Sequence, residues 1–191
     1  TLSLLEAVSS VDSVKAHVVV TTDKVYRNIN QVAGYVESDP LGGFDPYSSS
    51  KAMADLLTQS WISSFPGTPT TIVRAGNVIG GGDWAENRIV PELIRGFSTQ
   101  NLVPIRNPLS TRPWQHVLDP LRGYVMALEA TLSGSVVDAL NFGPDSRSLS
   151  VREIVNICRE NWPSPTSIEF LDSSQSESIE AISLQLDSSL A

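Results

Sequence analysis

Two hydrophobic patterns alternate along the chain: runs of consecutive apolar residues, and segments with helical spacing. The run AHVVVTT (16–22) is apolar at successive positions, which is typical of a strand covered on both faces of a parallel sheet. Further strands are predicted at TPTTIVRA (68–75), LVPIR (102–106), VVDALNFG (136–143) and SIEF (167–170). Helical segments fall between these runs, so the pattern predicts alternating strands and helices.

The predicted helices carry recognisable start signals. They are Leu2 to Ser10, Tyr47 to Ser64, VPELIRGF (90–97), WQHVLDPLRGYVMALEA (114–130), which begins extended, and Val151 to Glu160. Asp45 is a suitable N-cap for the second helix, and Pro46 fits its first position. Ser150 and Glu153 have the spacing of a capping box before the last helix.

This alternation indicates an α/β fold with a parallel sheet, in which ligands bind at the carboxyl ends of the strands. Two segments stand at such ends: TTDK (21–24) and the glycine-rich GNVIGGGDW (76–84). Residues 23–44 show no clear period and are predicted to form a long loop, and loops of that length are usually functional.

Composition narrows the class of protein. The chain of 191 residues is 41% hydrophobic and has a net charge of -8, which argues against nucleic-acid and anionic-membrane partners. The single cysteine, Cys158, excludes a disulfide within the chain and indicates a reducing compartment, so we expect a cytoplasmic location. No apolar run is long enough to cross a membrane. Both ends read as the interior of a longer protein, and we expect the chain to be a fragment.

Tyr47 and Lys51 are four residues apart and should share one face of the predicted helix. A lysine ammonium beside a phenol, near the positive end of the helix dipole, favours the phenolate and would prepare Tyr47 as a general base. The same spacing arises by chance in roughly one in three chains of this length, in which case both are ordinary surface residues.

Thr22, Asp23 and Lys24 follow the first predicted strand directly. Their hydroxyl, carboxylate and amine can serve hydrogen bonding and acid or base chemistry. Thr and Asp are also common in simple strand-ending turns, so the segment alone does not decide between the two interpretations.

Arginines near the glycine-rich segment suggest an anionic ligand. Arg88, Arg106 and Arg112 flank it, and a guanidinium binds phosphate oxygens through two hydrogen bonds. His116 stands among apolar residues and fits a hydrogen-bonded structural role better than that of a base. No Cys/His spacing typical of zinc occurs, so no metal site is expected.

Four motifs in order, TTDK, YSSSK, RAGNVIGGGDWAENRIVPELIR and RPWQHVLDPLRGY, resemble the extended short-chain dehydrogenase/reductase (NAD-dependent epimerase/dehydratase) superfamily, and within it the CDP-glucose 4,6-dehydratases. The resemblance implies a Rossmann-type enzyme that uses NAD to oxidise C4 of CDP-glucose, eliminate water across C5 and C6, and return hydride to C6. It implies that Tyr47 is the active-site base and Lys51 its partner. It also implies that Thr22 hydrogen-bonds the sugar hydroxyl that is oxidised and that Asp23 is the acid that protonates the departing C6 hydroxyl. Lys24 stands where related dTDP-glucose enzymes have a glutamate base, and only a neutral lysine can accept that proton.

The resemblance also assigns binding residues. It implies cofactor contacts from Thr21, Tyr47, Lys51, Ala75, Asn77 and Val78, and substrate contacts from Asn77, Arg88, Arg106, Arg112 and His116. The implied organisation is a partial doubly wound sheet: residues 1–80 form the C-terminal half of the NAD-binding domain and 81–135 a mainly substrate-binding segment. Residues 136–150 hold the last Rossmann strand, and 151–191 form part of a smaller C-terminal substrate domain.

The chain departs from the family in one respect, because it has no Gly-x-x-Gly-x-x-Gly turn before Tyr47. We therefore expect the 191 residues alone to bind NAD poorly and to be inactive, with 16–22 as an exposed, poorly soluble edge strand. A homo-oligomer is expected for the full-length protein. The alternatives are a nucleotide-sugar epimerase or reductase, and a non-catalytic nucleotide-binding relative.

Overall fold

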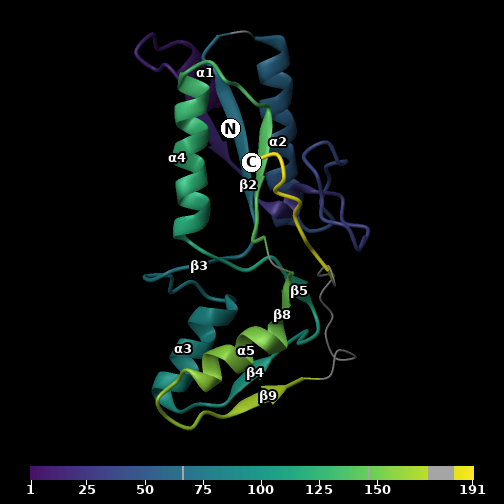
Figure 1. Ribbon diagram of the computed structural model, residues 1–191, viewed down its shortest axis with the longest axis vertical. Helices are drawn as coiled ribbons and strands as arrows, with labels where there is room; N and C mark the ends of the chain where they lie inside the picture. Colours follow the sequence, from purple (N-terminus) through teal and green to yellow (C-terminus); the bar gives the residue numbers. More distant parts are fainter. Residues whose placement is uncertain (66, 146, 172–182) are drawn as a thin grey trace.

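A computed structural model describes residues 1–65, 67–145, 147–171 and 183–191, which form two lobes (Figure 1). The first lobe holds a three-stranded parallel sheet in the order β1 (His17–Val20), β2 (Thr70–Ala75) and β7 (Ala139–Phe142). Figure 1 shows α2 (Pro46–Ser64) and α4 (Leu118–Leu132) on opposite sides of this sheet, and α1 (Leu2–Ser9) packs against α2. The α/β fold with a parallel sheet is confirmed.

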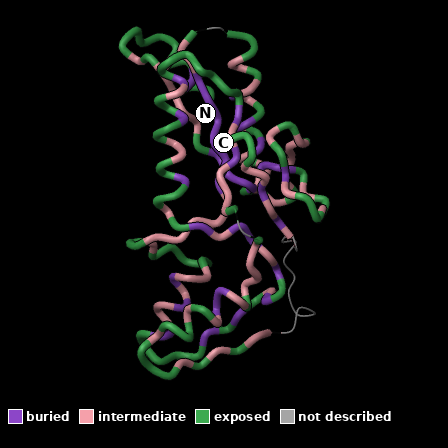
Figure 2. Tube along the Cα trace, viewed as in Figure 1, coloured by how far each residue is buried: buried purple, intermediate pink, exposed green. Residues whose placement is uncertain are grey.

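The central strand β2 is buried along its whole length, whereas β1 lies at the edge of the sheet. Val20 at the end of β1 is 51% exposed although its neighbours are apolar. The expected edge position of this strand is thus confirmed, but only Val20 is exposed: His17, Val18 and Val19 are partly buried, and Thr21 and Thr22 are buried. Figure 2 shows the buried residues concentrated along the sheet, with the outer faces of the helices exposed.

The second lobe is smaller and has its own core. It consists of α3 (Ile89–Thr99), α5 (Val151–Glu160) and the parallel pair β4 (Val103–Ile105) and β9 (Ile168–Phe170). The helices and β4 contribute the buried residues Leu93, Phe97, Val103, Ile105 and Val155. Two short ladders, β3 (Val78–Ile79) with β6 (Gln115–His116) and β5 (Thr111–Arg112) with β8 (Leu149–Ser150), lie where the lobes meet (Figure 1).

Helix ends follow the sequence signals. The Asp45 carboxylate accepts a hydrogen bond from the Ser48 N–H at 2.9 Å, and Pro46 opens α2. Ser150 and Glu153 form the complete capping box of α5. Both predicted caps are confirmed, and the first of them sets the position of Tyr47 in the first turn of α2.

The chain returns to the first lobe at its end. Leu184 and Leu186 are buried against Tyr26 and Tyr35, and the Tyr35 N–H donates to the Gln185 carbonyl at 2.8 Å. The domain boundaries remain a prediction, although α4 packs on the sheet and not in the smaller lobe. The segment 172–182 of the expected C-terminal domain lies outside the described residues.

Searching the described ranges finds no helix with the length and hydropathy needed to span a membrane. Over the same ranges no group of three or more His, Cys, Asp or Glu side chains is arranged to hold a metal ion.

Candidate active site

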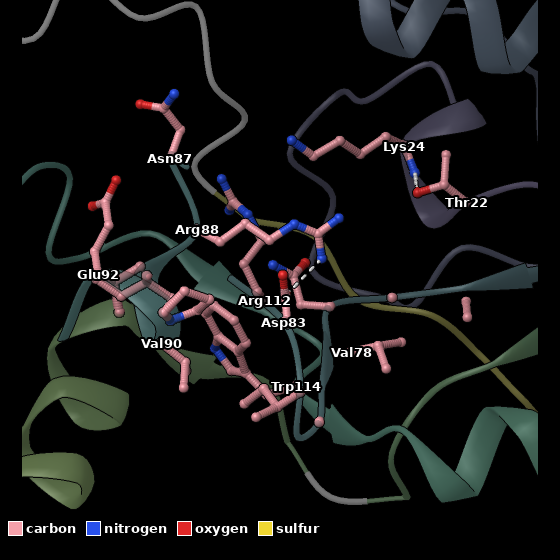
Figure 3. Close-up of a pocket in the computed structure, with 18 of the residues that line it drawn as sticks. Thr22, Lys24, Val78, Asp83, Asn87, Arg88, Val90, Glu92, Arg112 and Trp114 are labelled. Atoms are coloured by element: carbon pink, nitrogen blue, oxygen red, sulfur yellow. Dashed lines mark hydrogen bonds and ion pairs between the residues drawn. The ribbon is translucent and has the colours of Figure 1, made fainter. Parts of the chain in front are cut away.

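A cavity of about 700 Å³ opens at the carboxyl ends of β1 and β2 and extends to the smaller lobe (Figure 3). Ten of the residues singled out in the sequence line it: Thr21, Thr22, Lys24, Tyr47, Ala75, Asn77, Val78, Arg88, Arg106 and Arg112. Residues from both lobes therefore form one concave site, as expected for an α/β sheet.

Thr22, Asp23 and Lys24 are held by a one-turn 3-10 helix, η1 (Asp23–Val25), directly after β1. The Thr22 hydroxyl accepts from the Lys24 N–H at 3.4 Å and donates to the Asp23 carboxylate at 3.0 Å. Asp23 is only 2% exposed, and its Oδ2 has no hydrogen-bond partner among the described residues. Burial raises the pKa of Asp23 to about 6, against opposing effects of Thr22, Lys24 and Arg112. This carboxyl group is therefore suited to hold a proton close to neutral pH.

Tyr47 lies in the first turn of α2 and is 51% exposed at the cavity. The ammonium of Lys24 lies 5.9 Å from the centre of the Tyr47 ring. Lys51 follows one turn later, is half-buried, and is not among the residues that line the cavity. The cation that the structure brings to the Tyr47 ring is thus Lys24, from the neighbouring strand end.

The three arginines reach the cavity from different elements. Arg112 on β5 is buried and donates to the Thr111 carbonyl at 2.8 Å, which fixes its guanidinium. Arg88 precedes α3 and pairs with Asp83 at 3.3 Å, and Arg106 follows β4. The sequence predicted this cationic wall, and such a wall suits a diphosphate.

His116 does not line the cavity. It is exposed on β6, and its Nδ1 accepts a hydrogen bond from the Leu118 N–H at 3.3 Å at the start of α4. Its neighbour Gln115 is buried because side chains alternate along a strand, a pattern too short to recognise in the sequence.

The end of β2 forms another wall, made of Ala75, Gly76, Asn77 and Val78. A Cβ on Gly76 would lie 2.4 Å from the Pro113 ring, so only glycine allows the strand to approach that segment so closely. Thr21 and Tyr47 also line the cavity, and with Ala75, Asn77 and Val78 they are five of the six residues predicted to contact NAD. The glycine turn that holds the pyrophosphate of NAD in related folds is not among the 191 residues.

A buried ion pair that sequence reasoning missed supports these walls. Asp55 on α2 and Arg74 on β2 are both 0% exposed and form a double hydrogen bond at 2.8 and 2.9 Å. The Asp55 carboxylate also accepts from the Thr21 hydroxyl at 2.9 Å and the Gln59 amide at 2.8 Å. One carboxylate thus connects the ends of β1 and β2 to the helix that carries Tyr47. An arginine inside a buried strand was the available sequence signal.

Among the lining residues that were not predicted as site residues are Asp83, Glu92, Trp114 and Tyr124. Tyr124 on α4 packs edge-on against Phe142 with ring centres 5.6 Å apart. Burial, followed by the nearby charge of Asp23, raises the pKa of Tyr124 to about 12, so its hydroxyl keeps its proton. Asp83 belongs to the glycine-rich segment 76–84 that was expected at a ligand-binding strand end, whereas no spacing in the sequence relates Glu92, Trp114 and Tyr124 to the cavity.

Known proteins with similar sequences are sugar-nucleotide enzymes. CDP-glucose 4,6-dehydratase of Salmonella typhimurium is 42% identical over 202 aligned residues, which cover 100% of this chain and 56% of that protein. dTDP-glucose 4,6-dehydratase of an Actinoplanes species is 32% identical over 71% of this chain and 42% of its own length. The chain thus spans about half the length of the curated relatives it matches.

Solved structures with the same fold cover almost the whole chain. dTDP-glucose 4,6-dehydratase from Bacillus anthracis, in complex with NAD, has a TM-score of 0.81 at 23% identity, over 98% of this chain and 57% of that one. UDP-glucuronic acid 4-epimerase from Bacillus cereus, in complex with UDP-glucuronic acid and NAD, has a TM-score of 0.84 at 21% identity, over 98% and 57%. The model of the NAD dependent epimerase/dehydratase family matches residues 1–143. The chain therefore belongs to the NAD dependent epimerase/dehydratase family.

Proposed function

We propose that these residues form the catalytic and substrate-binding part of an NAD-dependent sugar-nucleotide 4,6-dehydratase that acts on CDP-glucose. The observation that carries the proposal is Asp23, a buried carboxyl group that does not line the cavity itself but accepts a hydrogen bond from Thr22 of the cavity wall, and whose pKa is raised to about 6. An epimerase needs only redox chemistry and a turn of the sugar, whereas a dehydratase also needs an acid to release the C6 hydroxyl as water. The relative that is 42% identical over the whole chain supports the same choice.

The residues divide the reaction between them. Tyr47, exposed at the cavity, accepts the proton of the C4 hydroxyl while Thr22 hydrogen-bonds that hydroxyl. NAD, held by the residues assigned to the cofactor, would supply the hydride chemistry, with oxidation at C4 and reduction at C6. The C4 ketone acidifies the C5 proton, and the amine of Lys24, 5.9 Å from the centre of the Tyr47 ring, is the group proposed to accept it. Asp23 then gives its proton to the leaving C6 hydroxyl.

Binding is assigned to the remaining walls. Arg88, Arg106 and Arg112 hold the diphosphate, with Asn77 beside them. Thr21, Ala75, Val78 and Lys51 complete the cofactor assignment. Met53 and Leu56 are 64% and 49% exposed on α2, and a second copy covering them would give the expected homo-oligomer of a cytoplasmic enzyme. Light scattering of the purified protein measures that state directly.

The test uses a protein that carries these 191 residues in their natural context, incubated with CDP-glucose and NAD+ and followed by NMR. We expect a CDP-4-keto-6-deoxyglucose product, and recovery of a C4 epimer alone would refute the dehydratase assignment. Tyr47→Phe should lower kcat by about 10²–10⁴-fold because the base is lost. Asp23→Asn should still oxidise C4 yet fail to eliminate water. A 4-keto sugar that keeps its C6 hydroxyl would then accumulate.

A further inference from the structure

The cavity has two chemically different ends. Thr22 and Lys24 lie at one end, and Figure 3 shows Glu92 and Asn87 at the other, with Arg88 between them. If the sugar reacts at the first end and the diphosphate lies on the arginines, the nucleoside reaches the first turn of α3. This orientation rests on the proposed function.

Glu92 is the notable group at the nucleoside end. It is half-buried, and no residue in the described ranges gives its carboxylate a hydrogen bond or an ion pair. The other lining carboxylate, Asp83, is paired with Arg88 at 3.3 Å. Pro91 and Leu93 on either side of Glu92 are buried, and Leu93 belongs to the core of the smaller lobe. The backbone that carries Glu92 is therefore fixed against that core.

Glu92 stands in the first turn of α3, where the helix dipole favours a carboxylate, and its oxygens remain available to a ligand that donates hydrogen bonds. Ionised Glu92 can only accept hydrogen bonds. The exocyclic N4 amine of cytosine is a donor, whereas uracil and thymine present the O4 acceptor at the same place. A buried acceptor facing another acceptor leaves both unsatisfied.

We propose that Glu92 reads the base of the nucleotide by accepting a hydrogen bond from the N4 amine of cytosine. It thereby selects cytidine diphosphates and rejects uridine and thymidine diphosphates. Glu92 is a specificity residue in this scheme and takes no part in the chemistry at the sugar, which occurs at the opposite end of the cavity.

The test is calorimetric binding of CDP and UDP to a protein that carries these 191 residues in their natural context. We expect CDP to bind about tenfold or more tightly than UDP. Glu92→Gln should bring the ratio close to one, because an amide can also donate to O4. Glu86→Gln is the matched control: Glu86 is exposed, does not line the cavity, and its replacement changes the charge equally, so the ratio should stay as in the parent.

Each outcome decides the inference. The inference is overturned if Glu92→Gln has the same ratio of CDP to UDP affinity as the parent. An equal loss of the affinities for CDP and UDP also overturns it, because Glu92 would then contact the ribose. Failure of both nucleotides to bind at millimolar concentration overturns it together with the assignment of the arginines. A CDP preference that depends on Glu92, in a protein that yields no 4-keto-6-deoxy sugar, supports base reading and refutes only the proposed reaction.

Discussion

Replacing Asp55 by Asn tests how the active-site walls are held together. The Asp55 carboxylate accepts four hydrogen bonds, two from Arg74 and one each from Thr21 and Gln59, and it is 0% exposed. Asparagine keeps one acceptor oxygen, turns the other into a donor that faces donors, and removes the negative charge. The guanidinium of Arg74 then stays buried without its ion-pair partner.

The expected cost is large because burial prevents water from replacing the lost partner. Breaking a buried ion pair by removing one member destabilises a protein by about 3–5 kcal/mol. For a chain of this size each kcal/mol lowers Tm by roughly 2–4 °C, so Asp55→Asn should lower Tm by roughly 6–20 °C. Urea unfolding with an unchanged m-value measures the same difference in the free energy of unfolding.

Two matched variants make the interpretation specific. Asp83→Asn breaks the exposed pair with Arg88, whose side chain is 60% exposed, and should cost less than about 1 kcal/mol. Thr21→Val removes one hydrogen bond of Asp55 and should cost about 1 kcal/mol, and its effect should change when Asp55→Asn is already present. A loss for Asp55→Asn as small as that for Asp83→Asn would refute the reasoning.

Three other predictions concern stability. The folded state raises the pKa of Asp23 from 3.8 to about 6, so the folded state binds its proton more tightly than the unfolded chain. About 3 kcal/mol of stability is therefore lost as pH rises from about 4 to about 6. In urea unfolding, Asp23→Asn should be more stable than the parent at pH 7.5 but not at pH 4. A difference in stability that does not change with pH would contradict this. Gly123→Ala places a Cβ 2.2 Å from the Phe142 ring, which must move to make room. The variant should therefore have a lower Tm in calorimetry, whereas an unchanged Tm would mean that α4 shifts freely. Ser150→Ala removes the capping box of α5 and should cost about 1 kcal/mol in urea unfolding, unlike Ser63→Ala at an exposed position.

Local signals predicted much of the fold. Consecutive apolar residues identified β1 and β2, and the Asp45, Pro46 and Ser150 signals located the starts of α2 and α5. The ladders β3–β6 and β5–β8 were not predicted as pairs because two-residue strands carry no measurable period. Their pairing depends on how the two lobes meet, which is a tertiary property.

Strand ends and the four sequence motifs predicted part of the site, and residues outside both were missed. Thr22 and Lys24 reach the cavity because strand ends of a parallel sheet share one edge. Glu92 and Tyr124 reach it from helices whose orientation is set by packing. Asp55 resembles any polar helix residue in the sequence, and its partner Arg74 becomes recognisable only once β2 is known to be buried.

The position of the cavity has a consequence for how ligand fragments combine. Tyr47 belongs to the sheet lobe, whereas Glu92 and Arg106 belong to the smaller lobe (Figure 1). A molecule that touches both walls therefore binds the two lobes at the same time. In the proposed orientation, cytidine would contact mainly the smaller lobe and glucose mainly the sheet lobe, with the phosphates on the arginines between them. When the two parts are joined in one molecule, binding of the first part to its lobe brings the second part close to the other lobe. The resulting gain in affinity depends on how rigidly the two lobes are held relative to each other. The ratio between the affinity of the joined molecule and the product of its fragments' affinities is thus a thermodynamic measure of the freedom between the lobes.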